Sequence, residues 1–194
     1  MGLSYREDIK LPFELCDVKS DIKFPLLLDY CLTVSGRQSA ALGRSNDYLL
    51  EEYGLVWIVT DYEVTIHRLP RFKETITIET QAMSYNKLFC YRQFYIYDQE
   101  GQLLVDILAC FALLHPDTRK VASIPEDLVA PFETDFVKKL RRAPKMHLLE
   151  ESIDRDYHVR YFDIDMNGHV NNSKYLDWMY DCLLYTSDAA DERS

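Results

Sequence analysis

The sequence predicts an α+β protein in which a long antiparallel sheet curls around one buried helix. The segment Phe24–Gly43 has the pattern of a helix whose first half is apolar on nearly every face, so other parts of the chain have to cover it. Four long β-rich segments follow it: Leu55–Leu69, Glu74–Tyr85, Leu88–Tyr97 and Gln102–Leu114. A sheet wrapped around the helix would bury both the helix and the inner face of the sheet, which is the hot-dog arrangement.

Each boundary of this arrangement has a local reason. Tyr5–Cys16 alternates apolar and polar residues and is predicted to be a half-buried strand. Pro25 suits the first turn of the helix, and Gly43 suits its end. The sequence Asp98–Gly101 predicts a hairpin turn, in which Gly101 can adopt a positive φ.

Composition excludes several classes of function. The 194-residue chain carries 32 acidic and 22 basic residues, and this acidic balance argues against nucleic acid as the main partner. No apolar run reaches the roughly 18 residues of a membrane span, and the N-terminus lacks the apolar core of a signal peptide. We therefore expect a cytoplasmic protein with no membrane span.

The cysteines and the missing motifs narrow the chemistry further. The cysteine spacings match no metal-ligand set, so we interpret these residues as reduced thiols, and Cys31 in particular as a core residue. The chain has no G-x-S-x-G, P-loop, H-E-x-x-H or C-x-x-C motif. A serine hydrolase, a nucleotide enzyme or a metalloenzyme is unsupported, and we expect no metal and no cofactor.

The sequence pattern indicates that the fold begins twice, because Asp165 lies 148 positions after Asp17 and the strand, loop and helix patterns align at that shift. We therefore predict tandem hot-dog folds. The predicted parts are an N-terminal domain at 1–116, a connector at 117–150 and the start of a second domain at 151–182. Cys182–Glu192 resembles the translation of a transposase-type sequencing adapter. We expect residues 183–194 to be a non-native tail, the second copy to be truncated, and this polypeptide alone to be inactive and aggregation-prone.

The stretch DIDMNGHVNNSKYLDW, residues 163–178, places Asp165, Asn167 and His169 on alternate positions directly before a predicted helix. A helix start needs only one small polar capping residue, and this stretch offers several more. The first copy has Lys19 and Asp21 where the second has Asn167 and His169. Because folding does not demand the Asn and the His, their presence points to function.

This motif resembles that of the acyl-ACP thioesterases of fatty-acid synthesis, in their bacterial form. The likeness runs from about residue 4 to 181 and includes IPEDL and LRRAPK in the connector. It implies a cofactor-free hydrolase that cleaves the thioester of long-chain acyl-ACP and releases free fatty acid. It also implies that Asp165, Asn167 and His169 are catalytic, with a further acidic residue downstream of this chain.

Thioester hydrolysis gives each of these side chains a possible task. Histidine is the residue type whose ordinary pKa suits proton transfer near neutral pH, so His169 could move the proton. Asp165 could orient a water, attack directly or hold His169 in one tautomer, and Asn167 could donate to the thioester oxygen. The backbone N–H groups at the start of the helix, with Gly168, Asn171 and Asn172, would bind the substrate.

Simpler structural interpretations stand beside these. Asn171 and Asn172 are more simply helix caps, Asp165 could cap a turn, and His169 alone would more often be structural. The remaining histidines are interpreted as structural: His67, His115, His147 and His158.

Binding of the acyl tail and of the carrier protein is predicted elsewhere in the chain. The tail would lie in the first unit between helix and sheet, where the candidate lining residues are Trp57, Met83, Phe94 and Phe111. The basic connector residues are either a solvated linker or a docking surface for acidic acyl carrier protein: Lys138, Lys139, Arg141, Arg142 and Lys145.

Two other functions stay open. One is an acyl-CoA thioesterase of the 4-hydroxybenzoyl-CoA thioesterase-like hot-dog type, and the other is a non-catalytic acyl-binding hot-dog module. A monomer or a homodimer is expected, because hot-dog units usually pair and the tandem copies could pair within one chain.

Overall fold

The computed structural model describes residues 2–139, 141, 147, 154–166 and 168–191, with side chains up to Leu183 in the last helix. The chain divides into two compact units, Met1–Ala143 and Pro144–Ser194. The division falls inside the predicted connector. Each unit is described by itself below.

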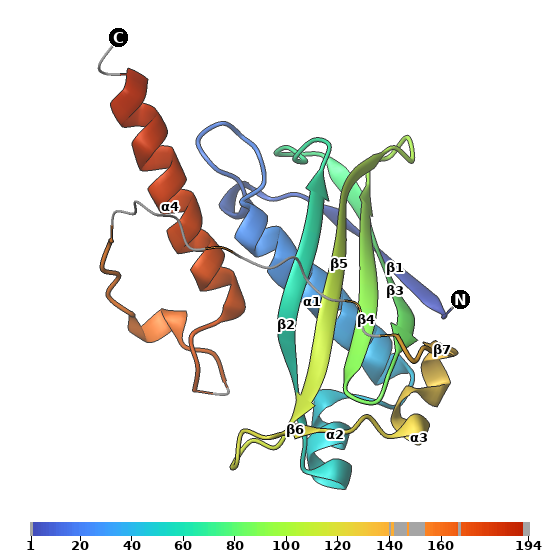
Figure 1. Cartoon of the computed structure of the whole chain (residues 1–194). Coiled ribbons are helices and arrows are strands. Elements are labelled where there is room, and N and C mark those ends of the chain that lie inside the picture. Colours follow the sequence, from blue (N-terminus) through green and yellow to red (C-terminus); the bar gives the residue numbers. More distant parts are fainter. Residues whose placement is uncertain (1, 140, 142–146, 148–153, 167, 192–194) are drawn as a thin grey trace. The chain divides into compact units, whose positions relative to one another are not determined.

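The first unit is an antiparallel sheet wrapped around helix α1 (Phe24–Ala41), as Figure 1 shows. The long strands are β1 (Ser4–Lys10), β2 (Val56–Ile66), β3 (Thr75–Tyr85), β4 (Phe89–Tyr97) and β5 (Leu103–Leu114). They lie in the order β1-β3-β4-β5-β2, and every neighbouring pair is antiparallel. The predicted fold class is confirmed.

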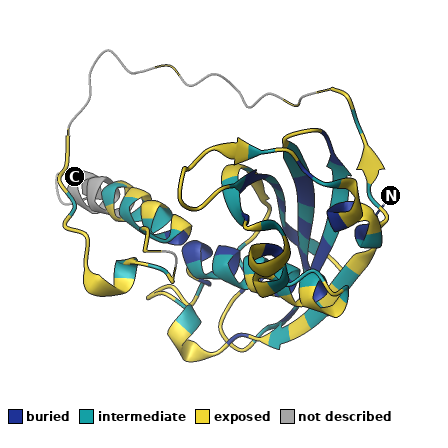
Figure 2. Cartoon of the chain, turned by 90° about the horizontal axis from the view of Figure 1, so that it is seen from below, coloured by how far each residue is buried: buried dark blue, intermediate teal, exposed yellow. Residues whose placement is uncertain are grey.

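The apolar core lies between α1 and the inner face of the sheet. Leu27, Leu28 and Cys31 of α1 are buried against a sheet face that includes Phe94 and Ile96, and Figure 2 shows the buried residues on these elements. Each large apolar side chain buried here stabilises the fold by about 1.5–3 kcal/mol. The interpretation of Cys31 as a core residue is confirmed, and burial raises the pKa of its thiol.

The ends of α1 follow the predicted signals. Pro25 lies in the first turn, where its missing N–H costs no hydrogen bond. Gly43 follows the last turn with φ 68°, and its N–H donates to the Ala40 carbonyl.

Several elements differ from the prediction. The first strand ends at Lys10 instead of Cys16, because Pro12 has no N–H for a ladder and a 3-10 turn, Phe13–Leu15, follows it. Helix α2 (Asn46–Tyr53) was not predicted, although Ser45 caps it by accepting from the Tyr48 N–H at 3.1 Å.

The connector also contains short elements that the sequence did not predict. These are β6 (Val121–Ala122), α3 (Glu126–Val129), a 3-10 turn at Ala130–Phe132, and β7 (Asp135–Phe136). β6 pairs with β5, and β7 pairs in parallel with β3. α2, β6 and α3 contribute residues to a second apolar cluster, which includes Leu49, Leu113 and Leu128.

The second unit consists of a 3-10 turn at Tyr161–Asp163, a loop and helix α4 (Asn172–Asp191). The helix begins directly after the loop, where the sequence predicts a helix. The described residues of this unit form no strand beyond the isolated bridge between Ile164 and Val170. The second hot-dog fold therefore stays a prediction.

Candidate functional site

The loop Ile164–Val170 carries the predicted catalytic residues and is closed by backbone hydrogen bonds. The Asp165 N–H donates to the His169 carbonyl at 2.7 Å, and the Gly168 N–H donates to the Asp165 carbonyl at 3.0 Å. Gly168 has φ 75°, a conformation that glycine adopts without steric cost. The loop thus places the backbones of Asp165 and His169 opposite each other across one tight turn. Asn167 lies outside the described residues.

The Asp165 carboxylate helps to shape this turn. Its Oδ1 accepts a hydrogen bond from the backbone N–H of His169 at 3.2 Å. Asp165 is half-buried, whereas His169 is exposed. This contact confirms the interpretation of Asp165 as a turn cap. A contact between a carboxylate and a backbone N–H does not test catalysis, so the catalytic role of Asp165 stays a prediction.

The start of α4 is set by Asn171. Its Oδ1 accepts from the Ser173 N–H at 3.2 Å, which is the capping contact of a helix N-terminus. Asn172 is the first helical residue and is exposed. Asn171 is therefore a cap, whereas Asn172 is not. The N–H groups of this first turn lie directly after the loop that holds His169.

The same loop occurs in the first unit, 148 positions earlier. Cys16 and Ile22 form the bridge that Ile164 and Val170 form in the second unit. The Asp17 N–H donates to the Asp21 carbonyl at 2.8 Å. Further matches include Ser20 N–H to the Asp17 carbonyl, Lys23 N–H to the Leu15 carbonyl, and the 3-10 turn and helix starts at Phe13 and Phe24.

The side chains at the equivalent positions do different work. In the first unit, Asp21 Oδ1 accepts from Arg71 Nε at 2.9 Å, and this ion pair ties the loop to the segment after β2. In the second unit, His169 stands at the position of Asp21, and Asn167 stands at the position of Lys19. The backbone of this loop therefore forms with either set of side chains.

The predicted acyl-contacting residues all belong to the first unit. Trp57 packs edge-on against Phe111, with ring centroids 6.3 Å apart, beside the second apolar cluster. Phe94 is fully buried in the main core. Met83 lies where a β-bulge interrupts the pairing of β3 with β4.

The basic connector residues divide into two kinds. Lys138 and Lys139 are exposed. Arg141 forms an ion pair with Glu63 of β2, and its backbone N–H donates to the Tyr91 hydroxyl at 3.2 Å. Arg141 thus binds the connector to the outer face of the sheet. Arg142 and Lys145 lie outside the described residues.

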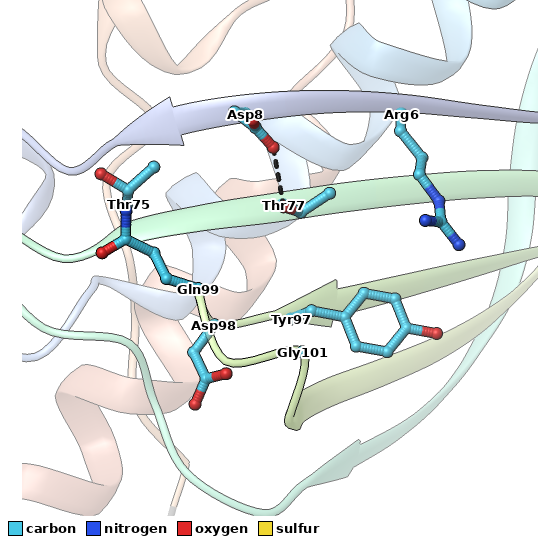
Figure 3. Close-up of a pocket in the computed structure, with 8 residues that line it drawn as sticks. All are labelled: Arg6, Asp8, Thr75, Thr77, Tyr97, Asp98, Gln99 and Gly101. Atoms are coloured by element: carbon cyan, nitrogen blue, oxygen red, sulfur yellow. Dashed lines mark hydrogen bonds between the residues drawn. The ribbon is translucent and has the colours of Figure 1, made fainter.

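A polar groove of about 510 Å³ lies on the outer face of the sheet. Figure 3 shows its lining: Arg6, Asp8, Thr75, Thr77, Tyr97, Asp98, Gln99 and Gly101. Its charged groups already have partners, because Asp8 accepts from the Thr77 hydroxyl at 2.7 Å and Arg6 pairs with Glu79 at 2.7 Å. None of the predicted site residues lines it.

A buried polar cluster inside the first unit was missed. Arg92 lies on the inner face of β4, only 8% exposed, and contacts Gln38 of α1 and Thr80 of β3. The sequence held a signal for it, because alternation along β4 puts Arg92 on the same face as Phe94 and Ile96. A charged residue on a core face is uncommon and calls for a reason.

Comparison with known proteins decides the family. The family model described as the acyl-ACP thioesterase N-terminal domain matches residues 2–132, and that of the C-terminal domain matches residues 146–191. The chain belongs to the acyl-ACP thioesterase family. The N-terminal match covers the first unit through the turn at Phe132, and the C-terminal match includes the loop Ile164–Val170 and α4.

Individual relatives agree with this assignment. A crystal structure of a candidate oleoyl thioesterase from Lactobacillus plantarum is 36% identical, with a TM-score of 0.86 over 93% of this chain and 71% of that one. An acyl-ACP thioesterase from Bacteroides thetaiotaomicron, 19% identical, shares the fold with a TM-score of 0.81 over 92% of this chain and 73% of that one.

The curated relatives are longer proteins. The chloroplastic acyl-(acyl-carrier-protein) hydrolase FATB3 of Cuphea viscosissima is 25% identical over 191 residues, which are 92% of this chain and 46% of that protein. The chain therefore spans about half the length of this relative. Among the described residues, no helix is long and apolar enough to cross a membrane.

Proposed function

We propose that the protein hydrolyses the thioester of long-chain acyl-ACP and releases a free fatty acid. The observation that carries this proposal is the loop Ile164–Val170, which presents His169 directly before the first turn of α4 in a chain of this family. The free cysteines of the described residues suit a reducing compartment, and we place the reaction in the cytoplasm.

The proposed chemistry uses side chains and a water molecule. His169 accepts the proton of the attacking water and returns it to the leaving thiolate, a role worth roughly 10²–10⁴ in rate. Asp165 holds the backbone of His169 in place by accepting its N–H. Asn167 donates to the developing oxyanion, together with the N–H groups at the start of α4.

Recognition of the carrier is assigned to the exposed part of the connector. Lys138 and Lys139 are exposed cations that would steer an acidic carrier protein. Arg141 is excluded from this docking surface because Glu63 already neutralises it. Coenzyme A offers no protein surface for these lysines to recognise.

The decisive experiment compares hydrolysis of matched long-chain acyl-ACP and acyl-CoA by the protein expressed from its full gene. We expect a higher kcat/KM for acyl-ACP. The double substitution Lys138→Glu and Lys139→Glu should raise KM for acyl-ACP while leaving acyl-CoA turnover unchanged. Equal or better turnover of acyl-CoA would instead identify an acyl-CoA thioesterase, and a folded protein that cleaves neither would be an acyl-binding module.

A further inference from the structure

The interior of the first unit contains a charged side chain in an otherwise apolar layer. Along the inner face of β4, Ile96 and Phe94 belong to the main core, and Cys90 packs against the second apolar cluster. Arg92 lies between them. The two apolar parts of the interior therefore meet at a guanidinium group.

Every described partner of Arg92 is neutral. Its Nη1 donates to Gln38 Oε1 at 2.5 Å and to Thr80 Oγ1 at 2.9 Å. Its guanidinium carbon lies 5.4 Å from the centre of the Phe132 ring. Gln38 is itself held by a hydrogen bond from its Nε2 to the Leu3 carbonyl at 2.9 Å. We call Arg92, Gln38 and Thr80 the Arg92 cluster.

The missing feature is a carboxylate. Surface arginines of the same unit have one, since Arg6 pairs with Glu79 and Arg37 pairs with Glu7. No described carboxylate forms an ion pair with Arg92. Burial lowers the pKa of the Arg92 guanidinium to about 10, so the group stays charged at neutral pH. A buried charge without a counter-charge costs stability, which indicates that it is kept for a reason other than folding.

The cross-strand neighbours of Arg92 are small, and part of its donor set has no described partner. The residues paired with Arg92 on the neighbouring strands are both alanines, Ala82 and Ala109. In the same cross-strand row, Tyr62 pairs with Ala109 and has a buried hydroxyl that bonds to none of the described residues. Guanidinium carries five N–H donors, and the described contacts of Arg92 use only Nη1.

We propose that the Arg92 cluster is a polar end-stop for the acyl chain, and that it favours chains carrying a hydrogen-bond-accepting oxygen at their distal end. This inference rests on the proposed function and on the acyl chain lying between α1 and the sheet. A methyl end that reaches Arg92 would displace water from the charged guanidinium without accepting a hydrogen bond from it, which costs free energy. A hydroxyl end accepts an N–H that otherwise has no partner among the described residues.

The test measures binding, so it does not depend on hydrolysis. Displacement of the fluorescent cis-parinaric acid from the protein expressed from its full gene gives affinities for saturated fatty acids and their ω-hydroxy counterparts. The wild type should bind the ω-hydroxy acid more tightly at the chain length that reaches the cluster. Arg92→Met, similar in length but neutral and without donors, should reduce this ratio of affinities by about tenfold or more.

Matched variants guard the interpretation. Arg6→Met makes the same substitution on the outer face of the sheet and should leave the ratio unchanged. Arg92→Lys keeps the buried charge but loses the planar fork of donors, and it replaces Arg92→Met if that variant does not fold. Thermal unfolding and gel filtration establish that each variant is folded.

The outcomes separate this inference from the proposed function. An unchanged ratio in a folded Arg92→Met or Arg92→Lys protein would overturn the end-stop, and so would a wild type that binds no fatty acid. Hydrolysis of acyl-ACP would survive either result. Conversely, a ratio that depends on Arg92 in a protein without thioesterase activity would support the end-stop and contradict the proposed function.

Discussion

The loops Cys16–Ile22 and Ile164–Val170 share one backbone but differ in what their side chains do. In both, an aspartate carboxylate accepts from backbone N–H groups of its own loop, at 2.9 Å and 3.0 Å for Asp17 and at 3.2 Å for Asp165. In both, a residue with positive φ closes the turn, Ser20 at 67° and Gly168 at 75°. These shared features are sufficient to specify the loop.

The difference lies at the alternate positions. Asp21 is committed to Arg71 in the first loop, whereas the second loop has an exposed His169 in its place. The loop backbone is the same with an aspartate or a histidine at this position. The side chain at this position therefore does not determine the conformation of the loop. A position whose side chain is not needed for folding is available for a catalytic residue. The comparison therefore separates residues that stabilise the loop from candidate catalytic residues.

The largest expected effect contrasts His169 with Asp21. His169→Ala should lower kcat/KM for acyl-ACP by about 10²- to 10⁴-fold, because a positioned proton-transfer group is lost. Asp21→Ala should leave kcat/KM unchanged and reduce the free energy of unfolding by at most about 1 kcal/mol, since it breaks an exposed ion pair. Steady-state kinetics and urea unfolding of both variants measure the two quantities.

A similar loss of activity in both variants would contradict the comparison, because it would mean that the first loop also takes part in the reaction. Asp21→Asn is a useful control, since its amide oxygen can still accept a hydrogen bond from Arg71 without the charge. This variant should resemble the wild type in both measurements.

A smaller effect should separate the two roles of Asp165. Asp165→Asn keeps an oxygen that can accept from the His169 N–H, so the loop should survive, but it removes the negative charge of the carboxylate. We expect kcat to fall by about 10²-fold or more with little change in the unfolding midpoint. The matched Asp17→Asn should change only stability, by about 0.5–1 kcal/mol. Full activity of Asp165→Asn would contradict a catalytic role for Asp165 and leave only its role as a turn cap.

The fold was largely predictable because its signals are local. The apolar first half of α1, Pro25 and Gly43 each act within a turn or two of the chain, and alternation is visible in the first half of β3, ahead of its β-bulge. Helix α2 was missed because it has only 8 residues, too short for a clear local pattern, and its packing against distant β6 and α3 stabilises it instead.

The candidate site was only partly predictable. The pattern of residues 163–178 gave the loop and its polar residues, but not which polar group caps which backbone N–H, because that depends on the fold of the turn. Asn171 caps α4 and Asn172 does not, although the letters are the same. The contact of Arg92 with Gln38 joins residues 54 positions apart, and no local pattern shows it.

The smallest effect concerns the residue with positive φ in each loop. A side chain on Gly168 would meet no atom within 4 Å, so Gly168→Ala tests backbone strain alone and should cost about 1 kcal/mol. Ser20→Gly should relieve the same strain in the first loop and gain less, because glycine also loosens the unfolded chain.

Each unit has its own tryptophan, Trp57 or Trp178, and replacing the other by Phe gives each unit its own fluorescence signal during urea unfolding. Opposite signs in the two units are expected, and the same sign in both would mean that the two turns are not held in the same way.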